Sequence, residues 1–452
     1  MNLNFNFWQA FFRLVHVYAG IFIAPFIFIA ALTGLFYAAT PQIEQLIYSE
    51  VLYVDHQNHS KIQPLSQQIE TAKQSLSSTA QITEVRPSAT PNQTTRVIFS
   101  DPKLKQDNQA VFVDPYTLEI KGQLAVYGTS GLLPFRTTLD HLHRDLLLGN
   151  WGRFYSELAA SWLAILILTG LYQWIKRRKI LENKQTIHNK LIQKHSMIGL
   201  FLFPLLLFIA ITGLTWSEWA GENIRMLRQS LSWQTPTLVT SLKAESLPAV
   251  MMHHGDHVMT PHNPTAHISS EDFDTALAIA RQHGIDASQI QIKPPSDANQ
   301  AWTVSEIQRR WPTQADSIAI DMQQHQVLDQ LYFQDYPLIA KLTRWGVDAH
   351  IGLLFGWMNQ LILIIYALAL CSMIIYAYLA WYKRTDLKQT TMQLTEQSIM
   401  IWTQAAIKQK IALFFVISIV AVLLPLLGIN MLVTLVVIII KHVTAQKMIK
   451  KA

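Results

Sequence analysis

Two apolar stretches of this chain, HVYAGIFIAPFIFIAALTG (residues 16–34) and HSMIGLFLFPLLLFIAITG (residues 195–213), align without a gap. Both begin with histidine, carry glycine four residues later and proline nine residues later, and end in Thr-Gly. Each is apolar over roughly the 20 residues that a helix needs to cross a bilayer. Because an ionisable imidazole is costly at such a position, a histidine repeated in two spans points to a function.

The composition predicts a membrane protein. Half of the 452 residues are apolar, and the run at 411–440 is interrupted by Pro425, which favours a hairpin of two short spans. The first apolar run is too long for a signal peptide and contains Arg13 and His16, so we expect an uncleaved helix. Runs of spanning length are predicted at about 8–38, 155–175, 197–219 and 357–381.

The formal net charge of +6 reflects topology, because basic clusters such as Lys176–Lys179 and Lys383–Arg384 close predicted spans. Basic short loops mark the cytoplasmic side. We therefore expect a multi-pass protein of the bacterial inner membrane, with both termini in the cytoplasm, two periplasmic segments and no nucleic-acid partner. The only cysteine, Cys371, lies in a span, which excludes an intrachain disulfide, a four-cysteine iron–sulfur site and covalent c-type haem.

The chain is internally duplicated. The opening stretches match at an offset of 179 residues, and a second set of matches, including His143 with His350 and Gly149 with Gly356, has an offset of 207 residues. The second half is thus longer by 28 residues between its two spans. The sequence predicts an α-helical integral membrane protein with duplicated span–periplasmic module–span halves, small α+β periplasmic modules and a C-terminal helical hairpin.

These matches define the predicted domains. In order, they are TM1 (1–40), periplasmic module 1 (41–140), TM2 with its preceding histidine segment (141–180), a cytoplasmic loop (181–194), TM3 (195–220), periplasmic module 2 (221–345), TM4 (346–384), a cytoplasmic linker (385–410) and the TM5–TM6 hairpin (411–441). Within the modules we expect helices at 63–77 and 271–284, strands at 96–100, 110–124, 301–307 and 317–330, and loops at 77–83 and 86–95.

The four matched histidines fall into two classes by depth. His16 and His195 begin spans at the cytoplasmic face, whereas His143 and His350 precede spans on the outside. If the halves pack about a two-fold axis along the membrane normal, each class forms one pair. Haem iron accepts axial imidazoles from opposite sides, and helix bundles build cofactor sites from facing helices. We therefore predict two non-covalent haem b groups, one near each face.

Neighbouring residues extend this prediction. We call His16 and His195 the inner histidines. Gly20 and Gly199, each one turn after one of them, would let a flat porphyrin approach the backbone. His141 competes with His143, but it aligns with Asp348 in the repeat, so His143 is preferred.

Structural histidines and a proton relay stay open as alternatives, and zinc lacks further ligands beside the inner pair. Candidate haem-propionate partners, for which interfacial snorkelling is an equal explanation, are Arg13, Lys194, Arg144 and Arg344.

The pattern resembles the PepSY-associated transmembrane family over nearly the whole chain, including the terminal hairpin. The resemblance rests on H-x-x-x-G at the start of a span, a DPYT hairpin (114–117), LHRDLLLG (142–149) and a span ending in WIKR (174–177). Leu118 replaces the glycine usual in the family hairpin, and the second copy, DMQQHQVLD (321–329), retains only the Asp. Members include haem-containing inner-membrane reductases of ferric siderophores, so the resemblance implies outward electron flow and four haem ligands, His16, His195, His143 and His350.

The resulting hypothesis is a haem-dependent reductase that takes electrons from quinol or a cytoplasmic reductase and reduces a periplasmic ferric chelate. The chain has no G-x-G-x-x-G dinucleotide motif. Two other functions stay open: a non-enzymatic PepSY module that binds a periplasmic partner, and a cytochrome b relay to another periplasmic protein.

The second module also contains MMHHGDHVMTPHNPTAH (251–267), which suits iron or copper unless it is simply a polar loop. Its candidate metal ligands are His253, His254, His257, His262, Met251, Met252 and Met259.

Overall fold

The chain is described by a computed structural model that covers residues 6–55, 61–100, 108–128, 130–182, 186–243, 268–383 and 387–449. It forms two compact units. We call Met1–Ala38, Asp140–Ser232 and Leu361–Ala452 the membrane unit, and Ala39–Leu139 and Trp233–Gln360 the sheet unit.

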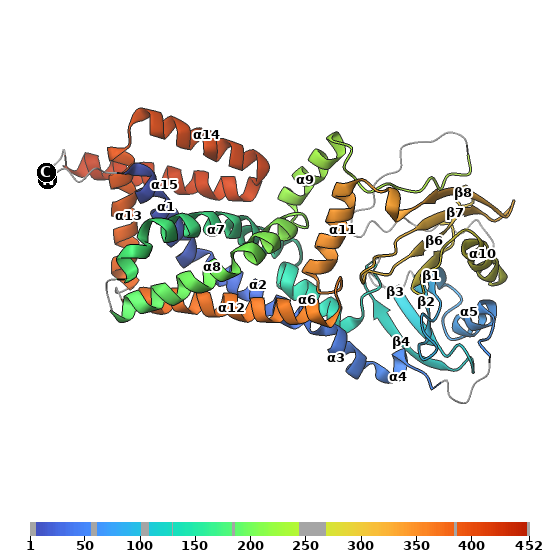
Figure 1. The fold of residues 1–452 in the computed structure, drawn as a ribbon. Helices are drawn as coiled ribbons and strands as arrows, with labels where there is room; N and C mark the ends of the chain where they lie inside the picture. Colours follow the sequence, from blue (N-terminus) through green and yellow to red (C-terminus); the bar gives the residue numbers. More distant parts are fainter. Residues whose placement is uncertain are drawn as a thin grey trace. The chain divides into compact units, whose positions relative to one another are not determined.

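The membrane unit consists of apolar helices (Figure 1). Among the described residues, three helical segments are long and apolar enough to cross a membrane, and the number rises to five if each of two bent helix pairs is one span. The chain is therefore a multi-pass membrane protein by length and composition. Its helices are α1 (Phe7–Phe22), α2 (Ala24–Ala38), α7 (Arg153–Glu182), α8 (Ile187–Leu214), α9 (Trp219–Ser230), α12 (Trp357–Tyr382), α13 (Leu387–Gln404), α14 (Ile407–Leu423) and α15 (Pro425–Ile449).

The first predicted span is two helices, α1 and α2, which are bent by 56°. Pro25 has no N–H, so the carbonyl of Ile21 has no partner one turn later. The Tyr378 hydroxyl of α12 donates to this carbonyl at 2.7 Å. The bend thus has an identifiable cause, and a side chain from the second half satisfies the freed backbone group.

The terminal hairpin has the predicted break. Helix α14 ends at Leu423 and α15 begins at Pro425. The predicted linker 385–410 contains a helix, α13, and the pair formed by Glu396–Gln404 and α14 is bent by 117°.

Among its described residues, the sheet unit contains one antiparallel sheet of eight strands in the order β4-β3-β2-β1-β5-β6-β7-β8. Its strands are β1 (Gln81–Arg86), β2 (Thr95–Ser100), β3 (Asn108–Val113), β4 (Ile120–Val126), β5 (Ile290–Lys293), β6 (Trp302–Glu306), β7 (Ser317–Asp321) and β8 (Gln326–Leu331). Its helices are α3 (Thr40–Ile47), α4 (Ser49–Leu52), α5 (Leu65–Gln74), α10 (Glu271–Gln282) and α11 (Leu338–His350), and α6 (Pro134–Asp145) runs from this unit into the membrane unit.

Residues 41–140 and 221–345, predicted as two separate periplasmic modules, both contribute strands to one sheet. The strand pair that joins them, β1 with β5, is registered on Val85 and Ile292. These two residues are 207 residues apart, so a residue pairs with its own repeat counterpart at the centre of the sheet. The helices and strands of the two copies in this unit match at the same offset of 207 residues, from α5 with α10 onward. The 28 extra residues of the second copy therefore lie between α8 and α10. Duplication of the membrane spans stays a prediction from sequence.

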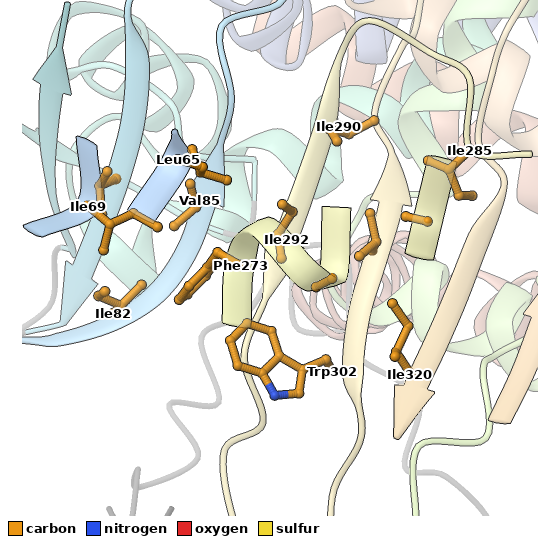
Figure 2. Packing of buried hydrophobic residues seen from close by; sticks show 14 of the residues in the cluster. Leu65, Ile69, Ile82, Val85, Phe273, Ile285, Ile290, Ile292, Trp302 and Ile320 are labelled. Carbon is orange, nitrogen blue, oxygen red and sulfur yellow. The ribbon is translucent and has the colours of Figure 1, made fainter. Parts of the chain in front are cut away.

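The core of the sheet unit lies between the sheet and the helices α5 and α10, which cover the same face (Figures 1 and 2). Ile69 of α5 and Phe273 of α10 are fully buried there, and the Phe273 ring meets Trp302 of β6 edge-on with centroids 4.7 Å apart. Both helices were predicted, whereas β1 overlaps the predicted loop at 77–83. Only Ile82 and Val85 of β1 are apolar, so the segment has no clear strand pattern of its own. It is a strand because it pairs with β2 and β5.

The two hairpins at the ends of the sheet have matching turns. Leu118 between β3 and β4 has φ of 66°, and His325 between β7 and β8, which is its counterpart, has φ of 52°. This left-handed conformation favours glycine, which accounts for the glycine usual at the Leu118 position in the family. In each turn an aspartate, Asp114 or Asp321, accepts backbone N–H groups two and three residues later.

Candidate functional site

The two inner histidines lie together in the membrane unit. His16 on α1 and His195 on α8 have ring centroids 6.3 Å apart, with ring planes at 73°. Two imidazoles that bind one iron through Nε2 from opposite sides have centroids about 6 Å apart, because each metal–nitrogen bond is about 2 Å. The spacing therefore suits a single metal centre between the rings.

Hydrogen bonds fix which ring nitrogen of each inner histidine carries the proton. The Thr169 hydroxyl of α7 donates to the Ile165 carbonyl at 2.7 Å, so its oxygen accepts from Nδ1–H of His16 at 3.0 Å. His195 Nδ1–H donates to the Met373 carbonyl of α12, also at 3.0 Å. Each Nε2 consequently keeps its lone pair, as a metal ligand requires.

The two predicted packing glycines have different surroundings. A methyl group added at Gly20 would meet no atom within 4 Å, so open space adjoins α1 one turn after His16. At Gly199 the same addition would lie 3.2 Å from the Met373 sulfur. The space beside α1 could accept a flat group, whereas the space beside α8 is occupied by a flexible side chain.

An apolar groove of about 650 Å³ lies between α2 and α12. Its lining includes Ile374, which follows Met373, the residue whose carbonyl accepts from His195. The lining is almost wholly hydrocarbon and aromatic. The lining residues are Pro25, Phe28, Ile29, Ile374, Ile375, Tyr378, Leu379, Trp381 and Tyr382.

His143 on α6 also lies against the membrane helices. Its Nδ1 is 3.0 Å from the Thr33 hydroxyl oxygen of α2. Burial lowers the pKa of His143, while the charge of Asp140 and a hydrogen bond to the Ala30 carbonyl act in the opposite direction. The competing residue, His141, instead bonds to the carboxylate of Asp145 at 3.1 Å.

His350 ends α11 in the sheet unit, whereas His143 belongs to the membrane unit. The pairing of these two residues therefore stays a prediction from the repeat. Asp348, fully buried two residues earlier, bonds to Arg309 at 3.2 Å and to Arg344 at 3.1 Å. Burial raises the pKa of Asp348, and the two arginines oppose this effect.

The candidate propionate partners have mixed surroundings. Arg344 is engaged by Asp348, and Arg144 lies 3.8 Å from Asp140 and 3.5 Å from Asp145. The Lys194 ammonium group lies over the Tyr376 ring, 5.3 Å from its centroid. Arg13 is on α1, one turn before His16. Acidic side chains therefore already neutralise Arg344 and Arg144.

Within the described ranges, no group of three or more His, Cys, Asp or Glu side chains is arranged to hold a metal ion. The His/Met segment 251–267 lies outside those ranges, so its ligands stay a prediction.

The sequence reasoning missed Thr33, Thr169 and the Met373 carbonyl as imidazole partners. It also missed His188, seven residues before His195 on α8, whose Nδ1 bonds to the Ala380 carbonyl at 2.9 Å. A backbone carbonyl that accepts from an imidazole has no signature in the sequence, because any residue type can supply it. Thr33 and Thr169 do share a signature, because each is followed by glycine.

The family model described as the PepSY-associated TM region matches residues 13–384. The chain belongs to this family. The match contains all four predicted haem-ligand histidines and ends shortly after α12. The terminal hairpin of this PepSY-associated membrane protein therefore lies outside the family region, although the sequence resemblance had included it. Among curated proteins, none matches the chain.

Proposed function

We propose that this PepSY-associated membrane protein is a di-haem b oxidoreductase of the bacterial inner membrane. It passes electrons outward to a periplasmic ferric siderophore or another ferric chelate, and releases Fe²⁺ for uptake. Both termini lie in the cytoplasm in this proposal. The observation that carries it is the pair of His16 and His195, whose ring centroids lie 6.3 Å apart and whose Nδ1 atoms are both hydrogen-bonded, so that each Nε2 keeps its lone pair.

The donor set fits haem better than a bare metal ion. A porphyrin supplies four nitrogen ligands, so the protein needs to supply only two, whereas zinc takes three or four protein ligands. The open space beside Gly20 could accept the porphyrin plane. Ala19, Ile23 and Ile374 belong to the buried apolar cluster of the membrane unit, which would exclude water.

His16 and His195 would hold the inner haem, and His143 and His350 would hold the outer haem. Haem bound between two imidazoles supplies a one-electron carrier with no open coordination position, which favours electron transfer over oxygen binding. Thr169 and the Met373 carbonyl hold the inner rings with Nδ1 protonated. The protein therefore orients its ligands before any cofactor arrives.

The overall reaction is a one-electron reduction of the chelated metal. Each ferric ion takes up one electron and becomes Fe²⁺, which hard oxygen chelators bind more weakly than Fe³⁺, so the metal leaves. If quinol is the donor, its oxidation to quinone supplies two electrons, enough for two ferric ions, and releases two protons. A cytoplasmic reductase is the other donor class.

The proposal is tested with the full chain purified in detergent from haem-replete cells. We expect a six-coordinate b-type visible spectrum, and reoxidation of the reduced haem when ferric chelate is added. His16→Ala and His195→Ala should each lower the haem content, whereas His188→Ala, which also removes an imidazole bonded to an α12 carbonyl, should not.

A colourless wild-type protein would contradict the proposal and leave the non-enzymatic PepSY module. Haem that ferric chelates do not reoxidise would overturn the reductase step and favour a relay to another protein.

A further inference from the structure

Three Thr-Gly pairs occur in the membrane helices, at 33–34, 169–170 and 212–213. In each pair the threonine hydroxyl donates to the carbonyl four residues earlier, at 2.7 or 2.8 Å. Such a bond uses the only hydroxyl proton and leaves oxygen lone pairs pointing away from the helix. Each threonine is thus prepared to accept a hydrogen bond.

At two of these pairs a histidine imidazole lies against the dipeptide in the same way. Thr169 accepts from Nδ1 of His16, and Thr33 accepts from Nδ1 of His143, both at 3.0 Å.

The following glycine makes room for the ring at both sites. A Cβ atom at Gly170 would lie 3.0 Å from Cε1 of His16, and one at Gly34 would lie 3.3 Å from Cε1 of His143. Carbon atoms pack at about 3.5–4.0 Å, so a side chain at either glycine would crowd the ring.

We infer that Thr169-Gly170 and Thr33-Gly34 are positioning pairs that fix the tautomer and the orientation of two haem-ligand imidazoles. Threonine, with its proton committed to the helix, accepts only Nδ1–H and leaves the lone pair on Nε2. Glycine leaves room for the ring beside the neighbouring helix. The assignment of the rings as haem ligands rests on the proposed function, whereas the tautomer is independent of it.

The effect on iron has a defined direction. An Nδ1–H that donates a hydrogen bond makes Nε2 a stronger electron donor, which stabilises Fe³⁺ relative to Fe²⁺. Removing the acceptor should therefore raise the midpoint potential of the haem that the affected histidine holds. It should also weaken haem binding by about 10-fold or more, as is typical for the outer partner of a metal ligand.

The test compares Thr169→Val, Thr169→Ser and Thr33→Val in the full chain. Valine keeps the shape of threonine without the oxygen, and serine restores it. Thr434→Val is the matched control, because the Thr434 hydroxyl makes the same bond to the carbonyl four residues earlier and faces the Tyr18 hydroxyl in place of an imidazole.

Haem affinity and a redox titration are measured for each variant. We expect Thr169→Val to weaken one haem and raise its potential, Thr33→Val to affect the other, and Thr169→Ser and Thr434→Val to resemble the wild type. If Thr169→Val leaves affinity and potential unchanged, or if serine fails to rescue, the inference is wrong.

A second measurement does not need haem. Haem-free chain labelled with ¹⁵N-histidine reports the tautomer by NMR, with the His16 signals assigned by their loss in His16→Asn. We expect a single Nδ1–H tautomer for His16 that becomes mixed in Thr169→Val. A mixed tautomer in the wild type would overturn the inference. A wild-type chain that binds no haem but shows the expected tautomer would overturn the proposed function alone.

Discussion

Replacing Gly20 with alanine separates the stability of the chain from its cofactor binding. Gly20 lies inside α1, and an added methyl group meets no atom within 4 Å. Alanine in a helix interior is more favourable than glycine by about 0.5–1 kcal/mol, which is a 2- to 5-fold change in an equilibrium constant. The haem-free variant should thus be slightly more stable than the haem-free wild type.

Haem binding should change in the opposite direction. If the porphyrin plane lies in the open space beside Gly20, the methyl group meets it below the contact distance of about 3.5 Å between carbon atoms. Overpacking of this kind costs about 1–3 kcal/mol, so haem affinity should fall about 5- to 150-fold. Gly199→Ala is the comparison, because its methyl group would meet only the flexible Met373 side chain.

The assay uses chain from haem-deficient cells. Thermal unfolding followed by tryptophan fluorescence gives the stability of the haem-free protein, and a haem titration followed by absorbance gives the affinity. Unchanged haem affinity in Gly20→Ala would refute the placement of the porphyrin beside α1. A less stable haem-free variant would show that the space beside Gly20 is not open.

Three other results are expected. Tyr378→Phe should lower the stability of the membrane unit by about 1–3 kcal/mol, because it leaves the Ile21 carbonyl without a partner, whereas Tyr382→Phe, at a side chain that is 72 % exposed, should not; equal melting temperatures would contradict this. Burial raises the pKa of Glu44, opposed by Arg136 and Arg96, so its contribution to stability is present below the unfolded pKa and lost as pH rises through the folded pKa. Glu44→Gln should remove that part of the pH dependence. The free energy of unfolding is measured by denaturant titration at several pH values across that range, and the same change with pH in the variant and the wild type would count against the prediction. Replacing His253, His254 and His257 by alanine should lower binding of Cu²⁺ or Fe²⁺ in calorimetry without lowering haem content, and a joint loss would indicate a structural role.

The sequence was sufficient to predict the long apolar helices, the helices α5 and α10, and the closeness of His16 and His195, whereas the two depth classes of histidine stay a prediction. These features depend on hydrophobic periodicity and on an internal repeat, which are visible in one chain. The repeat also matched Gly149 with Gly356, and both have the left-handed conformation that favours glycine, with φ angles of 58° and 59°.

Other features depend on partners far away in the chain. Strand β1 carries only two apolar residues of its core face, and it is a strand because β2 and β5 pair with it. The bond from Tyr378 to the Ile21 carbonyl follows from Pro25, but no pattern in α12 marks that tyrosine. The joining of strands from 41–140 and 221–345 into one sheet was likewise invisible, because a duplicated sequence is compatible with two separate modules.

The ligand environment was partly predictable. The four histidines, Gly20 and Gly199 stand out because they are repeated. The Thr-Gly that ends each of the stretches 16–34 and 195–213 is also repeated, but repetition alone predicts no function for it. A third Thr-Gly at 169–170 was the missing signal, since Thr169 and Thr33 both lie against a histidine imidazole.

The electron paramagnetic resonance spectrum of the oxidised full chain tests the central claim most directly. We predict low-spin ferric signals typical of iron bound by two imidazoles, with one signal lost in His16→Ala and in His195→Ala and both retained in His188→Ala. A wild-type protein without such a signal, or the same spectrum in His16→Ala and the wild type, would contradict the account.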